Sequence, residues 1–234
     1  VIAPERAANI IASFSPNLIT YPLVGHDLGS GHLPALLSLT ESAKRVSNGK
    51  AAVVIGGGIG RDEETQKTVR DYLSKADIPV VIDADAIWAI SKEKEILKGK
   101  KFILTPHSYE FYILSKISIS ELGEDQKIEV ARDFAKEFET TIILKGSPDI
   151  ISDGKEVFSN KTGCPEMTGG GTGDVLAGIC GCFLAQGTNP ILAANVSTYI
   201  NGRAGELAKK EVGVSLLATD VIEYIPRVIK SELS

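Results

Sequence analysis

A glycine-rich segment in the last third of the chain has the residue types needed to bind phosphate. It reads Thr168-Gly169-Gly170-Gly171-Thr172-Gly173-Asp174 and leads into an apolar helical stretch. Successive glycines let backbone N–H groups converge on one point, and a helix N-terminus adds partial positive charge there. Phosphate oxygens bind well at such a point. Asp174 could accept a proton from a substrate hydroxyl, or it could simply cap the helix.

Further polar residues follow apolar runs that resemble strands. Gly56-Gly57-Gly58 follows one run, Asp83 and Asp85 a second, His107 a third and Lys145 a fourth. Because parallel strands end at one edge of a sheet, where α/β proteins bind ligands, these residues are predicted to lie close together.

Each of these residues also has a purely structural interpretation. His107 could be a loop histidine, Lys145 could reach solvent, and Asp83 or Asp85 could cap a helix from Ala86 onward. Glu110 could assist a hydrated Mg²⁺, or could be a surface carboxylate in a first helical turn.

Two common phosphate-binding motifs are absent from the sequence. No G-x-x-x-x-G-K-[ST] pattern occurs, which excludes a P-loop protein. The segment Gly56–Arg61 carries Arg61 where the dinucleotide fingerprint requires its third glycine. A Rossmann dehydrogenase is therefore disfavoured.

Alternation of short β-branched runs with helical patterns predicts an α/β fold with a mostly parallel central sheet flanked by helices. After Lys145, a hairpin with a two-residue Asp153-Gly154 turn is expected to add a short antiparallel part. We expect one domain over residues 1–234. The predicted strands are 17–21, 51–55, 80–83, 102–105 and 141–144, and the predicted helices are 33–45, 62–75, 108–115, 125–138, 174–186, 190–209 and 219–231.

The composition of the chain argues against several classes of protein. The formal net charge is −5 and no run of Lys or Arg occurs, so nucleic acid is not an expected partner. No apolar stretch of about 18 residues or more occurs, so no membrane span is expected. Three cysteines are too few for a disulfide scaffold and suit a reducing cytoplasm.

Five segments together resemble the NAD(P)H-hydrate dehydratases, which have a ribokinase-like fold. Residues 54–60 are similar to the V-I-G-P-G-L-G segment of that family, and residues 79–86 to its P-V-V-L-D-A-D-A. Residues 104–111 are similar to L-T-P-H-P-G-E-F, and Leu144-Lys145-Gly146 and the loop ending in Gly173-Asp174 match in order. The resemblance covers nearly the whole chain.

The resemblance implies roles for individual residues. Gly58, His107 and Asp174 would bind the hydrated nicotinamide nucleotide, and Asp174 would be the catalytic base. Mg²⁺ would assist, with Glu110 as a possible ligand through water. The phosphate donor, ADP or ATP, would be bound by Lys145, Gly146, Ser147, Pro148, Asp149, Gly170, Gly171, Thr172 and Gly173.

The implied reaction is dehydration of the S-epimer of hydrated NADH or NADPH, with ADP favoured as donor. A ribokinase-like kinase of a vitamin precursor or sugar, and an inactive nucleotide-binding homologue, are the alternatives. Because the family is often tetrameric and residues 191–200 and 221–229 are rich in apolar side chains, a homo-oligomer is expected.

The sequence also departs from the family pattern. Glu166 replaces a glycine near the phosphate loop, and Ser108-Tyr109 replaces Pro-Gly. The sequence begins within a predicted strand, whereas family members carry a further βα unit with a substrate-contacting Gly-Ala pair. We therefore expect an additional segment supplied in trans, or an open side to the substrate cleft.

Overall fold

Short apolar runs form the central sheet of the computed structural model, which describes residues 1–232. The sheet has six strands in the order β3-β4-β5-β6-β7-β8. Strands β3 to β6 are parallel, and β7 and β8 continue the sheet in antiparallel pairing. The strands are β3 (Val53–Ile55), β4 (Val80–Ile82), β5 (Phe102–Leu104), β6 (Thr141–Leu144), β7 (Asp149–Ser152) and β8 (Val157–Asn160).

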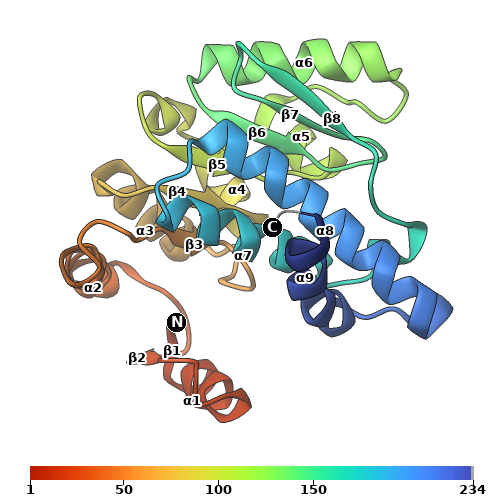
Figure 1. The fold of residues 1–234 in the computed structure, drawn as a ribbon. Coiled ribbons are helices and arrows are strands. Elements are labelled where there is room, and N and C mark those ends of the chain that lie inside the picture. Colours follow the sequence, from red (N-terminus) through yellow and green to blue (C-terminus); the bar gives the residue numbers. More distant parts are fainter. Residues whose placement is uncertain (233–234) are drawn as a thin grey trace.

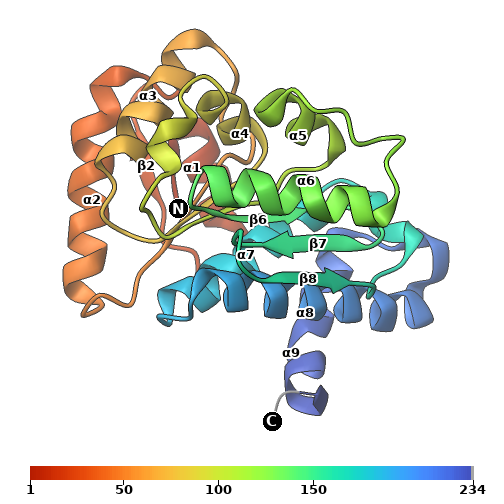
Figure 2. The same cartoon turned by 90° about the horizontal axis from the view of Figure 1, so that it is seen from above.

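Helices cover both faces of this sheet (Figures 1 and 2). On one face, Val80 and Ile82 pack against α3 (Glu63–Lys75), α4 (Ala84–Ile90), α5 (Ser108–Ser115) and α6 (Glu124–Glu137). On the other face, Val81 and Ile103 pack against α7 (Thr172–Ala185) and α8 (Pro190–Val212). Burial on both faces explains why the strands are continuously apolar instead of alternating. The predicted α/β layering is confirmed.

The N-terminal elements form a separate two-stranded parallel sheet of β1 (Ile2–Pro4) and β2 (Tyr21–Leu23), joined by α1 (Glu5–Phe14). The prediction of a strand over residues 17–21 in the central sheet is wrong. Residues 15–18 instead form a turn in which Leu18 N donates to Ser15 O. Among residues 1–232, β3 pairs only with β4, and Val54 is 46% exposed.

The chain then continues through α2 (Leu33–Val46), and the last helix that the structure describes is α9 (Ala218–Glu232), which packs on α8. Short 3-10 turns lie at Ser30–His32, Lys94–Leu97, Pro165–Thr168 and Gly213–Ser215. No helix in the described part of the chain is both long enough and apolar enough to cross a bilayer.

The hairpin between β7 and β8 is confirmed, but its turn is longer than predicted. Strand β8 begins at Val157, not at residue 155, so residues 153–156 connect the strands. The Asp153 carboxylate accepts hydrogen bonds from the backbone N–H groups of Lys155 and Glu156, both at 2.8 Å. These bonds hold the connection as a side-chain-supported turn in which only Gly154 has a positive φ, 87°.

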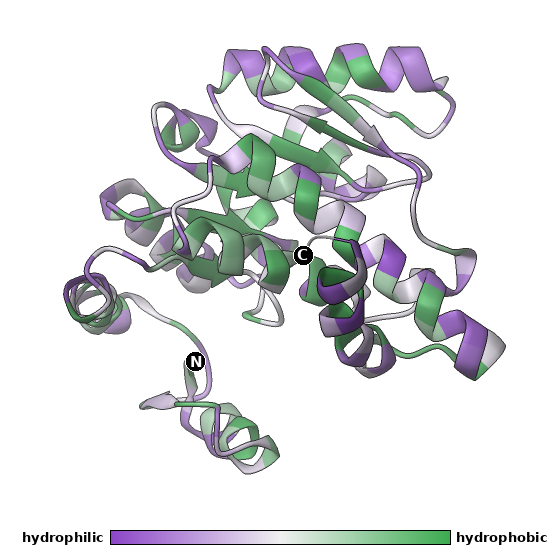
Figure 3. Cartoon of the chain, in the orientation of Figure 1, coloured by the Kyte–Doolittle hydropathy of each residue, from purple (hydrophilic) through white to green (hydrophobic). Residues whose placement is uncertain are grey.

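The apolar surface expected on α8 and α9 is partly buried and partly exposed. Ile191 and Ile200 are buried, as are Val221 and Val228, because α7, α8 and α9 pack against one another and the sheet. Leu192, Ile222 and Ile229 remain exposed, at 50%, 52% and 43%. Hydropathy mapped on the ribbon shows apolar residues along the N-terminal unit as well (Figure 3), where Ile19 and Val24 are 86% and 85% exposed.

Candidate functional site at the carboxyl edge of the sheet

Asp174 lies in the first turn of α7 and faces the loop that follows β3. Gly171 occupies the N-cap position in a left-handed conformation with φ 95°. The interpretation of Asp174 as the cap of the helix is therefore wrong. A methyl group on Gly57 would lie 2.9 Å from Asp174 Oδ1, so the carboxylate contacts the backbone of that loop. The predicted base is thus exposed at the sheet edge beside residues 56–58.

A buried carboxylate, Asp83, connects three strand ends. Its Oδ1 accepts hydrogen bonds from Thr105 Oγ1 at 2.6 Å and from Lys145 Nζ at 3.1 Å. The side chains of Asp83 and Lys145 are 6% and 21% exposed. Asp83 makes no side-chain bond to the α4 backbone, which excludes the capping interpretation. Lys145 is therefore held inside the site and does not extend into solvent.

Lys145 also reaches toward the glycine-rich loop. Its Nζ would lie 3.4 Å from a methyl group on Gly173. The same ammonium is 3.8 Å from Glu110 Oε2. A cation beside converging backbone N–H groups at a helix N-terminus is a suitable place for phosphate oxygens.

His107 and Glu110 form a reciprocal cap at the start of α5. His107 Nδ1 accepts from the N–H groups of Tyr109 and Glu110, at 3.1 and 3.3 Å. In return, the His107 N–H donates to Glu110 Oε2 at 2.9 Å. The Glu110 side chain is 6% exposed, so it is not the surface carboxylate that the sequence allowed. His107 Nε2 is 3.4 Å from Glu110 Oε1, and the His107 side chain remains half exposed at 52%.

The segment after Lys145 is held by Asp149. Asp149 Oδ1 accepts from the Gly146 N–H at 2.9 Å, and Oδ2 accepts from Asn160 Nδ2 at 3.2 Å. Burial raises the pKa of the Asp149 carboxyl above its ordinary value, although both hydrogen bonds act to lower it. Ser147 and Pro148 lie in this loop, joined by a cis peptide bond.

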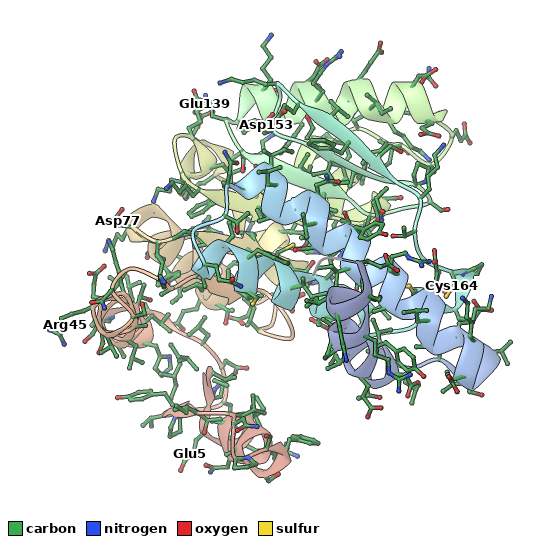
Figure 4. The ribbon with its side chains drawn as sticks, in the orientation of Figure 1. Glu5, Arg45, Asp77, Glu139, Asp153 and Cys164 are labelled. Carbon is green, nitrogen blue, oxygen red and sulfur yellow. The ribbon has the colours of Figure 1, made fainter. Side chains whose placement is uncertain are left out.

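The glycine-rich loop is attached to its surroundings at its two ends. Thr172 Oγ1 donates to Met167 O at 2.6 Å. Glu166, which replaces a family glycine, pairs with Lys209 on α8 at 2.8 Å. Lys209 lowers the pKa of the Glu166 carboxyl and neutralises the charge that this substitution adds. Figure 4 shows Cys164, at the start of this segment, beside α8.

The loop of Gly58 is fixed by Asp85. Asp85 Oδ2 accepts from the Gly60 N–H at 3.1 Å, and Oδ1 pairs with Arg61 Nε at 2.5 Å. Gly58 itself has a positive φ of 64°. Glycine suits this conformation because most residues avoid it.

The structure thus places the predicted site residues along one edge of the sheet, at the ends of β3, β5 and β6 and the start of α7. Sequence reasoning left Asp83 open between a cap and a catalytic role, and it missed Thr105. The available signal in the sequence was that Asp83 and Thr105 stand at the ends of two adjacent strands, β4 and β5. Among residues 1–232, no group of three acidic, His or Cys side chains is arranged to hold a metal ion.

A hollow of about 440 Å³ lies at the opposite edge of the sheet, around the starts of β5 and β6. Lys100, Lys101, Lys136 and Lys155 line it together with Glu139 and Asp153, which Figure 4 labels. The N-terminus of α8 borders it through Asn189 and Pro190, but no glycine-rich loop does, so it matches a nucleotide less well than the opposite edge.

Comparison with known proteins identifies the family of this chain. The sequence profile described as NAD(P)H-hydrate dehydratase matches residues 1–227. The bifunctional NAD(P)H-hydrate repair enzyme Nnr of Pyrobaculum aerophilum is 38% identical over 98% of this chain, which spans 44% of that protein. The ADP-dependent (S)-NAD(P)H-hydrate dehydratase of Cenarchaeum symbiosum is 36% identical over 97% of this chain and 76% of its own length.

Solved structures show the same fold. The ADP/ATP-dependent NAD(P)H-hydrate dehydratase of Bacillus subtilis, co-crystallised with ATP/Mg²⁺, has a TM-score of 0.74 and 27% identity over 97% of this chain and 76% of its own. A ribokinase-like superfamily protein of Enterococcus faecalis has a TM-score of 0.73 and 25% identity over 98% of this chain and 75% of its own. The ribokinase-like architecture is confirmed. Because the family profile covers nearly the whole sequence, the chain belongs to the NAD(P)H-hydrate dehydratase family.

Proposed function

We propose that this protein is a lyase that uses ADP or ATP to dehydrate the S-epimer of hydrated NADH or NADPH and so restores the reduced cofactor. One observation carries the proposal: a carboxylate, Asp174, meets the phosphate-binding groups at one point of the sheet edge. Asp174 contacts the loop of Gly57, and Lys145 lies beside Gly173, one residue before Asp174. The names of the Cenarchaeum and Bacillus relatives support the substrate and the donor.

In the proposed reaction, the terminal phosphoryl group of the donor passes to the hydroxyl of the hydrated ring. Asp174 accepts the hydroxyl proton as the oxygen attacks phosphorus. The N–H groups of residues 170–173 and the Lys145 ammonium stabilise the negative charge on the transferred oxygens. Phosphate then leaves the ring carbon, a proton leaves the neighbouring carbon, and the ring double bond returns.

We assign Gly58 and His107 to the substrate side of this site. Lys145–Asp149 and residues 170–173 form the donor side. Asp83 positions Lys145 by binding its ammonium at the end of β6, and Thr105 holds Asp83 in place through its hydroxyl.

Mg²⁺ fits this site as a companion of the donor phosphates. Such an ion keeps several waters and is usually held by one or two carboxylates plus phosphate oxygens, so a preformed cage is not required. Glu110 is the candidate that would hold it, through water; its Oε2 lies 3.8 Å from Lys145 Nζ, on the donor side of the site. When bound, the ion would neutralise charge on the donor oxygens.

The proposal is tested by incubating hydrated NADH with the protein, ADP and Mg²⁺. We expect recovery of the near-ultraviolet absorbance of the reduced nicotinamide, together with release of phosphate. ATP and the NADPH hydrate, tested in parallel, determine the donor and the cofactor preference. A stable phosphorylated product without recovery of absorbance would indicate a kinase. No turnover with either donor would indicate a nucleotide-binding homologue without activity.

We also propose that the chain forms one ribokinase-like domain that assembles into a homo-oligomer in the cytoplasm. Exposed apolar side chains support the assembly, among them Val214 at 86% and Leu217 at 65%. The three free cysteines, one of them buried, support a reducing compartment. A monomer mass by light scattering at micromolar concentration would contradict the oligomer.

A further inference from the structure

Four side chains form a continuous stack on the surface beside the candidate site. The Arg61 guanidinium lies 4.3 Å from the centre of the Trp88 ring. The Trp88 and Tyr109 rings are 5.9 Å apart and tilted by 58°, and the Tyr109 and Tyr112 rings are 6.3 Å apart, with their planes 26° from parallel. These separations lie within the range of attractive cation–π and aromatic contacts.

The stack is fixed to the substrate side of the sheet edge. Arg61 is held by Asp85, which also holds the loop of Gly58 through the Gly60 N–H. Trp88 lies on α4, and Tyr109 and Tyr112 lie on α5, which packs against α4 (Figure 2). The Tyr109 N–H donates to His107 Nδ1, so the backbone of Tyr109 is hydrogen-bonded to the histidine that we assign to the substrate side.

The outer rings of the stack are open to solvent. Tyr109 is 57% exposed and Tyr112 is 42% exposed, whereas most large apolar residues of α4 and α5 are buried. Packing within the chain therefore does not explain these rings. The related family pattern has glycine at the position of Tyr109, so the ring is a feature of this chain and not of the shared pattern.

We propose that this stack, through Tyr109, binds the adenine ring of the substrate dinucleotide. This inference rests on the proposed function. A purine is planar and aromatic and stacks on tyrosine, whereas the hydrated nicotinamide ring contains tetrahedral carbons and is not flat. The adenine of the donor is a less suitable occupant, because the donor groups lie at β6 and α7, while the stack lies at β4 and β5 beside Gly58 and His107.

The test compares two substrates that differ only in the adenosine half. Hydrated NADH contains the adenine ring, and hydrated reduced nicotinamide mononucleotide lacks it. Loss of one base–aromatic stack typically weakens binding about 5- to 150-fold. For Tyr109→Ala, we expect KM for hydrated NADH to rise by a factor in this range. KM for the mononucleotide and KM for ADP should stay the same, and kcat at saturation should change little.

Three controls accompany this measurement. Tyr109→Phe keeps the ring and should keep the wild-type KM. Phe14→Ala removes an exposed ring outside the stack, 77% exposed on α1, and should leave all three KM values unchanged. Emission from Trp88, the single tryptophan of the chain, reports whether the stack is perturbed when the dinucleotide binds.

The outcomes are distinct. Equal increases in KM for both substrates, or an unchanged KM for hydrated NADH, would refute adenine stacking while the dehydratase activity stands. An increase in KM for ADP alone would assign the stack to the donor. Absence of turnover in the wild-type protein would remove the proposed function, and this inference with it.

Discussion

Substitution of Gly57 by alanine tests whether the position of the Asp174 carboxylate, and not merely its presence, matters for turnover. The added methyl group would lie 2.9 Å from Asp174 Oδ1, whereas contacts closer than 3.4 Å are uncommon. The carboxylate must therefore move by about 0.5 Å. Since a misplacement of about 1 Å can cost about 10²-fold in rate, we expect kcat to fall about tenfold.

The stability of this variant should stay near that of the wild-type protein. Gly57 does not have a positive φ, and the displaced atom is the end of a flexible side chain. Gly178→Ala is the matched control: it lies on the same helix as Asp174, a methyl group there meets nothing within 4 Å, and it should leave kcat unchanged. Alanine in a helix is more stable than glycine by about 0.5–1 kcal/mol.

The assay is single-turnover recovery of absorbance from hydrated NADH at saturating ADP, with urea unfolding of the same preparations. A Gly57→Ala variant with wild-type kcat would refute the close approach of Asp174 to this loop as a catalytic requirement. A variant that is both slow and unstable would instead show that the loop conformation, not the carboxylate, was disturbed.

Three further predictions concern charges at and around the site. Asp174→Asn removes the proton acceptor, so turnover should fall about 10²- to 10⁴-fold while calorimetry shows nearly unchanged ADP affinity; unchanged turnover would contradict the assignment. Lys209→Met leaves the Glu166 charge unpaired near the donor phosphates, so KM for ADP at low salt should rise about 1.5- to 5-fold. KM should return to the wild-type value when Glu166→Gln is added to this variant. A rise that persists in the double variant would refute the pairing. Burial raises the folded-state pKa of Asp149, so between its ordinary pKa and the raised one the folded state binds more protons than the unfolded state. In that window the free energy of unfolding of the wild type, relative to Asp149→Asn, should fall as pH rises; urea titrations at a series of pH values test this, and a relative free energy that rises with pH would show the opposite sign.

The sheet and its helices could be predicted because their sequence patterns are local. Strands β4, β5 and β6 are buried on both faces, so each appears as a short, continuous apolar run. The N-terminal strand was misplaced because residues 17–20 are also apolar and β-branched in part. The strand lies at residues 21–23 because these residues pair with Ile2–Pro4. The sequence pattern of either segment alone does not reveal this pairing.

The individual site residues could be predicted from the sequence, but the side-chain contacts between them could not. Asp83 could cap a helix or face inward, and the choice depends on Thr105 and Lys145, which lie 22 and 62 positions away. The first turn of α7 posed a similar problem. Gly171 can adopt the left-handed cap conformation, which moves the start of the helix before Asp174 and turns an expected cap into a side chain facing another loop.

Helix α7 and the N-terminal unit are expected to differ in their resistance to local opening. Leu176, Ala177 and Cys180 pack on the sheet, while Val175 and Ile179 pack among α8 and α9, so the helix cannot detach without disrupting both apolar clusters. Residues 1–24, by contrast, bury only Ala8 and Leu23. Amide hydrogens of α7 should therefore exchange only in events close to global unfolding, and those of α1 in small local ones. The carboxylate proposed to do the chemistry is therefore mounted on a helix that is expected to exchange slowly, so fluctuations of the N-terminal unit can proceed without moving it.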